Sequence, residues 1–419
     1  MLRDYQVDIS NKANDLLHTF KIAYLSMQVR TGKTLTALET AKKFGAKKVV
    51  FITKKKAISS INDDYCNFGY VDSFDLYLNN FEQLHHFDVT DVDLFIIDEA
   101  HSLGQYPIPS LRTKQLKKIC TGKPIIFLSG TPSPESYSQI FNQLWVSSFS
   151  PFKEKNFYEW ARKYVAVAEK FIFNRKINDY SNADQMEIDI WTQHLFIPFT
   201  QIEAGFEQLV QEHVHTVKMS EKTYAIISKL KRDKVITGKN GQVIEADTAV
   251  KLMNKMHQIY SGTVIFDENP NNDADASILD TTKMSFILEK FKGKKIAIFY
   301  KFKAEDYMIR WFASKEGLKI TNSPEEFNSN TDMLFVSQFV SGREGINLSS
   351  ADALICINID YSAVTYLQVR ARLQTKDRET PAEVHWIFAE NGIEHDIYNR
   401  VKNKENYTLS YFKKSFYNN

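Results

Sequence analysis

The stretch MQVRTGKT, residues 27–34, decides how the rest of this sequence is interpreted. It follows a short apolar run at 22–25 and precedes a helical pattern that stops at Gly45. The tripeptide Thr-Gly-Lys also occurs at 121–123 and 237–239, but only this copy is followed by Thr and lies between a predicted strand and a predicted helix. At a helix N-terminus, backbone N–H groups bind phosphate, a lysine reaches the β- and γ-phosphates and a hydroxyl holds Mg²⁺. The stretch therefore predicts a phosphate-binding loop, with an ordinary strand–helix turn as the alternative.

A pair of carboxylates, Asp98 and Glu99, follows a second apolar run at 94–97. Ligands of open α/β sheets bind at the carboxyl ends of the strands, where this pair is expected to lie. The two groups can divide the work, with Asp98 in the shell of a magnesium ion and Glu99 polarising water. The alternative, an acidic surface loop, is weakened by the phosphate loop upstream.

Short apolar runs alternate with amphipathic stretches near both ends of the chain, which is typical of parallel sheets covered by helices on both faces. The predicted strands are 22–25, 49–52, 94–97, 125–128, 296–300, 333–336, 353–357 and 384–388, and the later ones are separated by helical stretches at 283–291, 303–316, 363–374 and 393–403. We therefore predict an α/β fold with two parallel-sheet domains in tandem, 1–149 and 278–419. The segment 150–277 is predicted to be mainly helical, with helices at 153–170, 220–234 and 246–261 and a linker near its end.

The composition is that of an ordinary globular protein, since 43% of the 419 residues are hydrophobic and 25% are charged. The 53 basic and 51 acidic residues nearly cancel, so a nucleic-acid partner would have to be held by local patches. The 3 cysteines are far apart, which argues against a zinc knuckle or a disulfide framework and favours reduced thiols. There is no run of 18 apolar residues and no signal-peptide pattern, so we expect a cytoplasmic protein without a membrane span.

Six stretches, in order along the chain, resemble the motifs of a superfamily-two helicase core, and within it the Swi/Snf-type translocases on double-stranded DNA. They are LRDYQ at 2–6, similar to the adenine-recognition motif; the phosphate loop; the DEAH box at 98–101; SGTP at 129–132, similar to the coupling motif; SGREGINL at 341–348, similar to the fifth motif; and QVRARL at 368–373, similar to the sixth. Weaker matches to the Swi/Snf branch are QLW at 143–145, VKMS at 217–220 and MHQIYSG at 256–262. The compact length and the Lys/Asn/Phe/Tyr-rich usage favour a phage version, in a bacterial or phage-infected cytoplasm.

The resemblance implies two RecA-like domains that use ATP and Mg²⁺. It implies that the catalytic residues are Lys33, Glu99, Gln368 and Arg372, the last as an arginine finger from the second domain. It further implies nucleotide contacts by Arg3, Gln6, Arg30, Thr31, Gly32, Lys33, Thr34 and Gly345, metal ligation by Thr34 and Asp98, and coupling to the nucleic acid by Ser129 and Thr131.

Two positions depart from the family's pattern. Met27 stands where the first glycine of the phosphate loop is expected. Thr375 stands where the sixth motif has its second arginine, and Lys376, Arg378 or Arg370 could substitute for it. Since an arginine finger can contribute about 10³–10⁵ in rate, Thr375 puts fast turnover in doubt.

The register of the finger follows from the predicted helix at 363–374. On a helix, Arg372 would lie one turn beyond Gln368 on the same face. Arg370 would lie about 200° around the helix and point away from the nucleotide. Arg372 could instead be an ordinary surface charge.

Nucleic-acid contacts are expected at the strand ends, which present backbone N–H groups and small polar side chains to phosphates. The candidates are Lys54, Lys55 and Lys56, Asn79 and Asn80, Tyr300, Lys301 and Ser341. Each lysine could equally be a solvated charge, as could the patch of Lys229, Lys231, Arg232 and Lys234.

The sequence thus predicts a monomeric, ATP-dependent motor that moves on duplex DNA. A strand-separating helicase on DNA or RNA is the nearest alternative, although the sequence shows no clear wedge. An ATP-gated nucleic-acid-binding module with little movement is the alternative from another class, and Thr375 is the residue that favours it. The sequence leaves open the polarity of movement and any recruiting protein.

Overall fold

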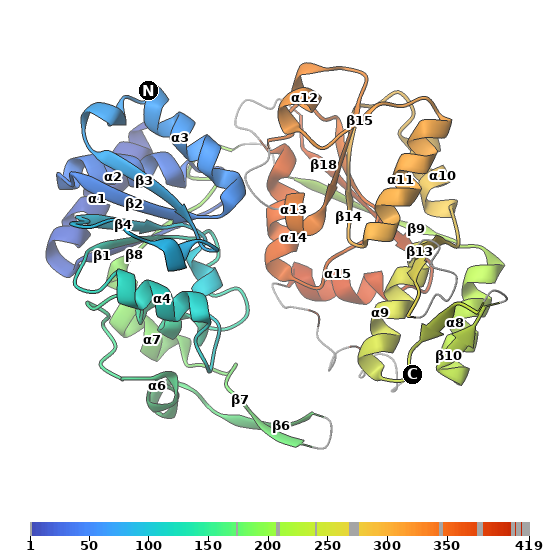
Figure 1. Cartoon of the computed structure of the whole chain (residues 1–419), viewed down its shortest axis with the longest axis horizontal. Helices are drawn as coiled ribbons and strands as arrows, with labels where there is room; N and C mark the ends of the chain where they lie inside the picture. The colour runs from blue at the N-terminus through green and yellow to red at the C-terminus, as the bar shows by residue number, and fades with distance from the viewer. Residues whose placement is uncertain are drawn as a thin grey trace. The chain divides into compact units, whose positions relative to one another are not determined.

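The computed structural model describes residues 2–172, 175–206, 210–238, 241–267, 276–342, 347–374 and 380–403, together with Tyr407 and Phe412. The chain forms two compact units, Met1–Phe206 and Glu207–Asn419, which we call unit 1 and unit 2 (Figure 1). In the described ranges, no helix is long and apolar enough to cross a membrane.

Unit 1 is built on a six-stranded, fully parallel sheet. In sheet order its strands are β3 (Asp75–Asn80), β2 (Lys48–Thr53), β4 (Leu94–Ile97), β5 (Ile125–Leu128), β1 (Ile22–Met27) and β8 (Phe196–Phe199). Alternate residues of β1 face opposite sides, so that Ile22 and Tyr24 join one buried cluster while Ala23 and Leu25 join another. Burial on both faces explains why these strands are continuous apolar runs in the sequence.

The helices of unit 1 cover both faces of this sheet (Figure 1). They are α1 (Asp4–Phe20), α2 (Lys33–Phe44), α3 (Ile58–Asn67), α4 (Leu111–Ile119), α5 (Gln139–Leu144), α6 (Phe157–Tyr164) and α7 (Gln185–Thr192). A hairpin of β6 (Ala168–Ile172) and β7 (Arg175–Asp179) extends from the unit (Figure 1). As predicted, α2 ends before Gly45, which adopts the left-handed conformation that only glycine enters without strain.

Unit 2 contains a second six-stranded parallel sheet. In sheet order its strands are β15 (Ile320–Thr321), β16 (Leu334–Gln338), β14 (Ile296–Tyr300), β17 (Ala353–Cys356), β18 (Glu383–Ala389) and β9 (Gln211–Val217). Its helices are α8 (Glu221–Asp233), α9 (Ala249–Tyr260), α10 (Thr282–Lys290), α11 (Lys303–Lys315), α12 (Pro324–Ser329), α13 (Phe339–Gly342), α14 (Ala363–Arg370) and α15 (Glu394–Lys402). Two parallel sheets covered by helices confirm the predicted α/β class of tandem RecA-like domains.

The segment 150–277 differs from the mainly helical region that the sequence predicts. It supplies β8, which pairs with β1, and β9, which pairs along its whole length with β18. It also holds the β6–β7 hairpin and two further hairpins, β10 (Val235–Thr237) with β11 (Val243–Glu245) and β12 (Thr263–Ile265) with β13 (Ala276–Ile278). The chain therefore divides once, between residues 206 and 207, and not at the two borders that we predicted around a middle segment.

Candidate functional site

The phosphate loop joins β1 to α2 and is closed by its own side chains. Gly32 caps α2 with φ 80°, and a Cβ at this position would lie 2.3 Å from a side-chain nitrogen of α1, so the position requires glycine. Thr31 is fully buried, and its hydroxyl donates to the carbonyl of Gln28 at 2.7 Å. The ammonium group of Lys33 donates to the carbonyls of residues 27 and 28 at 3.0 and 3.1 Å. The lysine thus lies against the loop where a phosphate is expected.

Two residues of α1's first turn are bound to this loop. The hydroxyl of Tyr5 donates to the carbonyl of Thr31 at 3.1 Å. The Nε2 of Gln6 donates to the carbonyl of Gly32 at 3.3 Å, and its Oε1 accepts the backbone N–H of Arg3 at 2.9 Å. The structure therefore brings Arg3 and Gln6, which the sequence proposed as nucleotide contacts, to the edge of the phosphate loop.

Gln201, which the sequence motifs do not include, fastens the loop from another side. Its backbone N–H donates to Oε1 of Gln28 at 2.8 Å, and its Nε2 donates to the carbonyl of Val29 at 3.0 Å. The backbone N–H of Gln28 in turn donates to the carbonyl of Phe199 at 2.8 Å. No local pattern marks Gln201, which lies 173 residues from Gln28. Only a prediction that β8 pairs with β1 could have found it.

The carboxylates lie at the carboxyl end of β4, as predicted. Oδ2 of Asp98 accepts a hydrogen bond from the hydroxyl of Thr53 at 2.9 Å, and Oδ1 accepts the backbone N–H of Glu99 at 2.9 Å. Burial and the neighbouring Glu99 carboxylate raise the pKa of Asp98 to about 6, against the opposing effects of Thr53 and Lys33. The charge of Lys33 is therefore close enough to Asp98 to act on it, although the two residues follow different strands.

Ser129, at the end of β5, connects the acidic pair to the coupling stretch. Its hydroxyl lies 3.0 Å from Nδ1 of His101, and the same nitrogen lies 3.2 Å from Oε2 of Glu99. The Ser129 hydroxyl also accepts the backbone N–H of Thr131 at 3.1 Å. A Cβ on Gly130 would lie 3.2 Å from a carbonyl of the phosphate loop. Ser129 and Thr131 are thus linked to Glu99 through His101.

The residues present fit a magnesium nucleotide. Thr34 is half-buried in the first turn of α2, and the 12-residue helix directs the N–H groups of its first turn at the loop. Burial lowers the pKa of Arg30 to about 10, so this guanidinium stays charged at neutral pH. No group of three or more His, Cys, Asp or Glu side chains could hold a metal alone within the part of the chain that the structure describes. Mg²⁺ commonly binds through one or two carboxylates together with substrate phosphates, which this site allows.

The proposed finger lies in unit 2, where the structure corrects one assumption. The helix α14 ends at Arg370, and Arg372 lies in the following 3₁₀ turn, residues 371–373. Arg372 is therefore not on one continuous helix with Gln368. Gln368 and Arg372 are both buried, with 6% and 9% of their surface exposed. The carbonyl of Arg372 accepts the backbone N–H of Leu348 at 3.4 Å, which places the turn against the end of the fifth-motif stretch. Gly345, Thr375 and two of the possible substitutes for the second arginine, Lys376 and Arg378, lie outside the described residues.

Arg370 points toward a largely buried carboxylate and not toward a solvent-facing edge. Its Nε lies 2.8 Å from Oε1 of Glu212 on β9. The same carboxylate accepts the hydroxyl of Tyr366 at 2.8 Å, Nε1 of Trp386 at 2.9 Å and the hydroxyl of Tyr398 at 3.3 Å. Three hydrogen-bond donors and one guanidinium, from three elements, thus converge on Glu212, which holds α14 and α15 against the edge of the sheet.

The predicted nucleic-acid contacts differ in how available they are. Asn80 is only 3% exposed, and its Oδ1 accepts the backbone N–H groups of Glu82 and Gln83, each at 3.0 Å. Its role is to close the turn after β3, so we withdraw it as a phosphate contact. Lys54 is half-buried, whereas Lys55 is exposed at the end of β2.

In unit 2 the candidates gather at the carboxyl ends of β14 and β16. Lys301 forms an ion pair with Asp360, and its ammonium lies 4.0 Å from the ring centre of Tyr361. Burial and the Asp306 carboxylate raise the pKa of Tyr300 to about 12, so its hydroxyl remains protonated. Ser341 is half-buried in α13. The charge of Lys301 is already compensated, which weakens its case as a phosphate contact.

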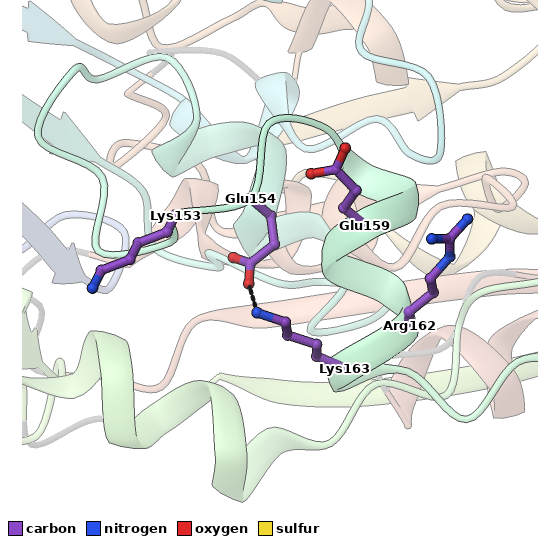
Figure 2. Close-up of a pocket in the computed structure, with 5 residues that line it drawn as sticks. All are labelled: Lys153, Glu154, Glu159, Arg162 and Lys163. Atoms are coloured by element: carbon purple, nitrogen blue, oxygen red, sulfur yellow. Dashed lines mark hydrogen bonds and ion pairs between the residues drawn. The ribbon is translucent and has the colours of Figure 1, made fainter.

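A separate cavity of about 350 Å³ lies beside α6 and is lined by charged side chains, Lys153, Glu154, Glu159, Arg162 and Lys163 (Figure 2). Glu154 and Lys163 form an ion pair at 2.6 Å, and Glu159 accepts hydrogen bonds from Asn156 and from the backbone of Lys155. Its carboxylates are thus engaged within the protein. None of its lining residues belongs to the phosphate loop or the acidic pair, and we assign it no role in catalysis.

No protein-family model and no curated protein matches the sequence. Among solved structures, the chain is similar to a Sulfolobus solfataricus SWI2/SNF2 ATPase core in complex with dsDNA, with 16% identity and a TM-score of 0.44, covering 99% of this chain and 93% of that one. A likeness of this size assigns no function, which has to be inferred from the residues of the site.

Proposed function

We propose that this chain is an ATP-dependent motor that moves on duplex DNA. The observation that carries the proposal is the arrangement in unit 1, where a glycine-capped helix N-terminus with Lys33 lies within electrostatic reach of Asp98, which Glu99 follows directly. Phosphate-loop ATPases need this combination, since the cation and the N–H groups hold the phosphates while carboxylates serve the metal and the water. The ordered motifs of the sequence support duplex DNA as the track.

Each residue would have a separate task. The N–H groups of α2 and Lys33 would hold the phosphates, and Thr34 and Asp98 would hold the metal. Glu99 would accept a proton from the attacking water, with His101 at 3.2 Å fixing the orientation of its carboxylate. Bound Mg-ATP would supply the bond that is cleaved and the divalent charge that neutralises its oxygens. Arg372 would stabilise the charge that develops on the transferred group.

The test is a side-by-side measurement of ATP hydrolysis with duplex DNA, single-stranded DNA and RNA. We expect the highest rate with duplex DNA and directional movement without strand separation at a fork. Stimulation by RNA alone, or fork unwinding, would instead favour the helicase. Hydrolysis that is slow with every nucleic acid would favour the ATP-gated module.

Two variants test the assignment of roles. Lys33→Ala should lose most ATP binding or turnover, because it removes the charge opposite the β- and γ-phosphates. Glu99→Gln should keep ATP binding and lose hydrolysis, because it removes the base and spares Asp98. Hydrolysis by Glu99→Gln at the wild-type rate would show that Glu99 is not the base.

A further inference from the structure

The outward face of α11 in unit 2 combines large aromatic rings with cations. Tyr307 is 65% exposed and Trp311 is 44% exposed, although both rings are apolar enough to be buried. Lys303, Arg310 and Lys315 are exposed on the same helix. The opposite face of α11 packs into the core of the unit, and Figure 1 shows the helix on its outside, beside α10.

The charges on this face are positioned around the rings. The ammonium of Lys315 lies 3.8 Å from the ring centre of Trp311. Arg310 lies one residue before the same ring and forms an ion pair with Asp306 at 2.8 Å. With Lys303, the face carries three cations, against Asp306 on the helix and the exposed Glu316 at its C-cap. The net positive charge is complementary to phosphate.

The same face continues to the predicted nucleic-acid edge of unit 2. It begins at Lys303, two residues after the candidate contact Lys301 at the end of β14. The hydroxyl of Tyr300 lies beside Asp306, whose charge acts on it. A nucleic-acid strand held at the carboxyl end of β14 would therefore be close to the first turn of α11.

We propose that this face of α11 binds a single-stranded extension of the nucleic-acid substrate. Tyr307 and Trp311 stack on bases, and Lys303, Arg310 and Lys315 contact the phosphates. Duplex DNA keeps its bases inside, whereas a single strand offers both a phosphate backbone and open ring faces, which is the combination that aromatic–cationic surfaces bind. The inference rests on the proposed function, since it extends the substrate of that motor.

The experiment compares a labelled blunt duplex with the same duplex carrying a single-stranded dT tail, by fluorescence anisotropy without ATP. Wild type should bind the tailed duplex more tightly. The double variant Tyr307→Ala/Trp311→Ala should lose about tenfold or more on the tailed duplex, in the range of base–aromatic stacking, and nothing on the blunt one. Lys315→Ala should reduce the log–log salt slope on the tail by about 0.7, the value for one single-strand phosphate.

Trp191→Ala is the matched control, because Trp191 is also 44% exposed but lies on α7 among Asp189 and Glu187. It should bind both DNAs as wild type does. An equal loss in this control, an equal loss on both DNAs, or no preference of wild type for the tail overturns the inference. Tail binding that depends on Tyr307 and Trp311, in a protein whose ATP hydrolysis no DNA stimulates, supports the inference and refutes the motor.

Discussion

Replacing Asp98 with asparagine should stabilise the ligand-free protein at neutral pH while it abolishes hydrolysis. The carboxylate is held in a buried position beside Glu99, and its pKa is raised from 3.8 to about 6. Both features disfavour its charged form in the folded state. A buried carboxylate whose charged form costs folding stability is what a divalent-cation site would contain before the cation binds. The variant should therefore raise the free energy of unfolding while it removes hydrolysis.

The magnitude follows from the two pKa values. A rise from 3.8 to about 6 corresponds to about 3 kcal/mol. Because the folded protein binds the proton more tightly, the penalty is absent below about pH 4 and complete above about pH 6. Asparagine removes the charge but keeps only one acceptor oxygen for Thr53 and the N–H of Glu99, which costs about 1 kcal/mol. We therefore expect a gain of about 1–2 kcal/mol at pH 8 and a loss of about 1 kcal/mol at pH 4.

The assay is calorimetry of the ligand-free protein at pH 4 and pH 8, read at the transition of unit 1. For a domain of this size, about 1 kcal/mol shifts Tm by about 2–4 °C, so the variant should melt about 2–8 °C higher at pH 8. A variant that melts lower than wild type at pH 8, or whose shift is the same at both pH values, would refute the reasoning.

Asp93→Asn is the matched control, because its carboxylate lies at the other end of β4 and is shifted in the opposite sense. Burial is the largest single effect on Asp93 and raises its pKa. The backbone N–H groups of Lys48 and Lys47, at 2.9 and 2.8 Å, and the charges of Lys123 and Lys48 together outweigh it and hold the pKa below the usual range. Its stabilisation is present above the unfolded pKa and is lost in acid. Asp93→Asn should therefore lower Tm at pH 8 and do so less at pH 4.

Three further outcomes are expected. Arg372→Ala should reduce DNA-stimulated hydrolysis by at least about 10²-fold with little change in ATP affinity. Arg370→Ala should hydrolyse ATP at the normal rate and only have a lower melting temperature. The reverse pattern in steady-state kinetics would show that the arginine-finger motif is shifted by two residues. Glu212→Gln should destabilise unit 2 by about 2 kcal/mol in thermal unfolding, since an amide NH₂ would then face hydrogen-bond donors. Asp306→Asn removes an ion pair of the same 2.8 Å that is more exposed to solvent, and it should cost at most about 0.5 kcal/mol. Gln201→Ala should raise KM for ATP severalfold with an unchanged melting temperature, and an unchanged KM would show that its contacts do not position the loop.

The central strands could be predicted from the sequence, whereas the outer strands could not. Buried parallel strands such as 94–97 and 125–128 are continuous apolar runs, and all eight that we predicted are present. The strand β9 has the sequence QEHVHTV, which is polar because one side of an edge strand faces solvent. Its partner β18 begins more than 160 residues later, so no local pattern joins them. This is why the predicted borders around 150–277 failed.

The site residues also divide into those that a local sequence pattern marks and those that depend on a distant strand pairing. The positions of Lys33 and Asp98 in the fold could be predicted because their motifs are local and come directly after recognisable strands, while their roles remain predictions. Gln201 was missed because its side chain acts through a strand pairing that its own neighbours do not indicate. The role of Asn80 was misjudged because a short polar side chain after a strand can cap a turn as well as bind phosphate, and only its 3% exposure distinguishes the two.

The contacts of Glu212 also have a consequence for the folding of unit 2 during synthesis. Glu212 is synthesised 186 residues before Tyr398, the last of its three hydrogen-bond donors in the chain. At about 5–20 residues per second, β9 waits on the order of 10–40 s before its hydrogen-bonding partners exist. An apolar strand waiting so long would invite pairing with other chains, and charged or polar residues are the usual protection for an exposed edge. We therefore expect the polar residues of β9, which hid this strand from prediction, to protect the nascent chain until α15 has been synthesised.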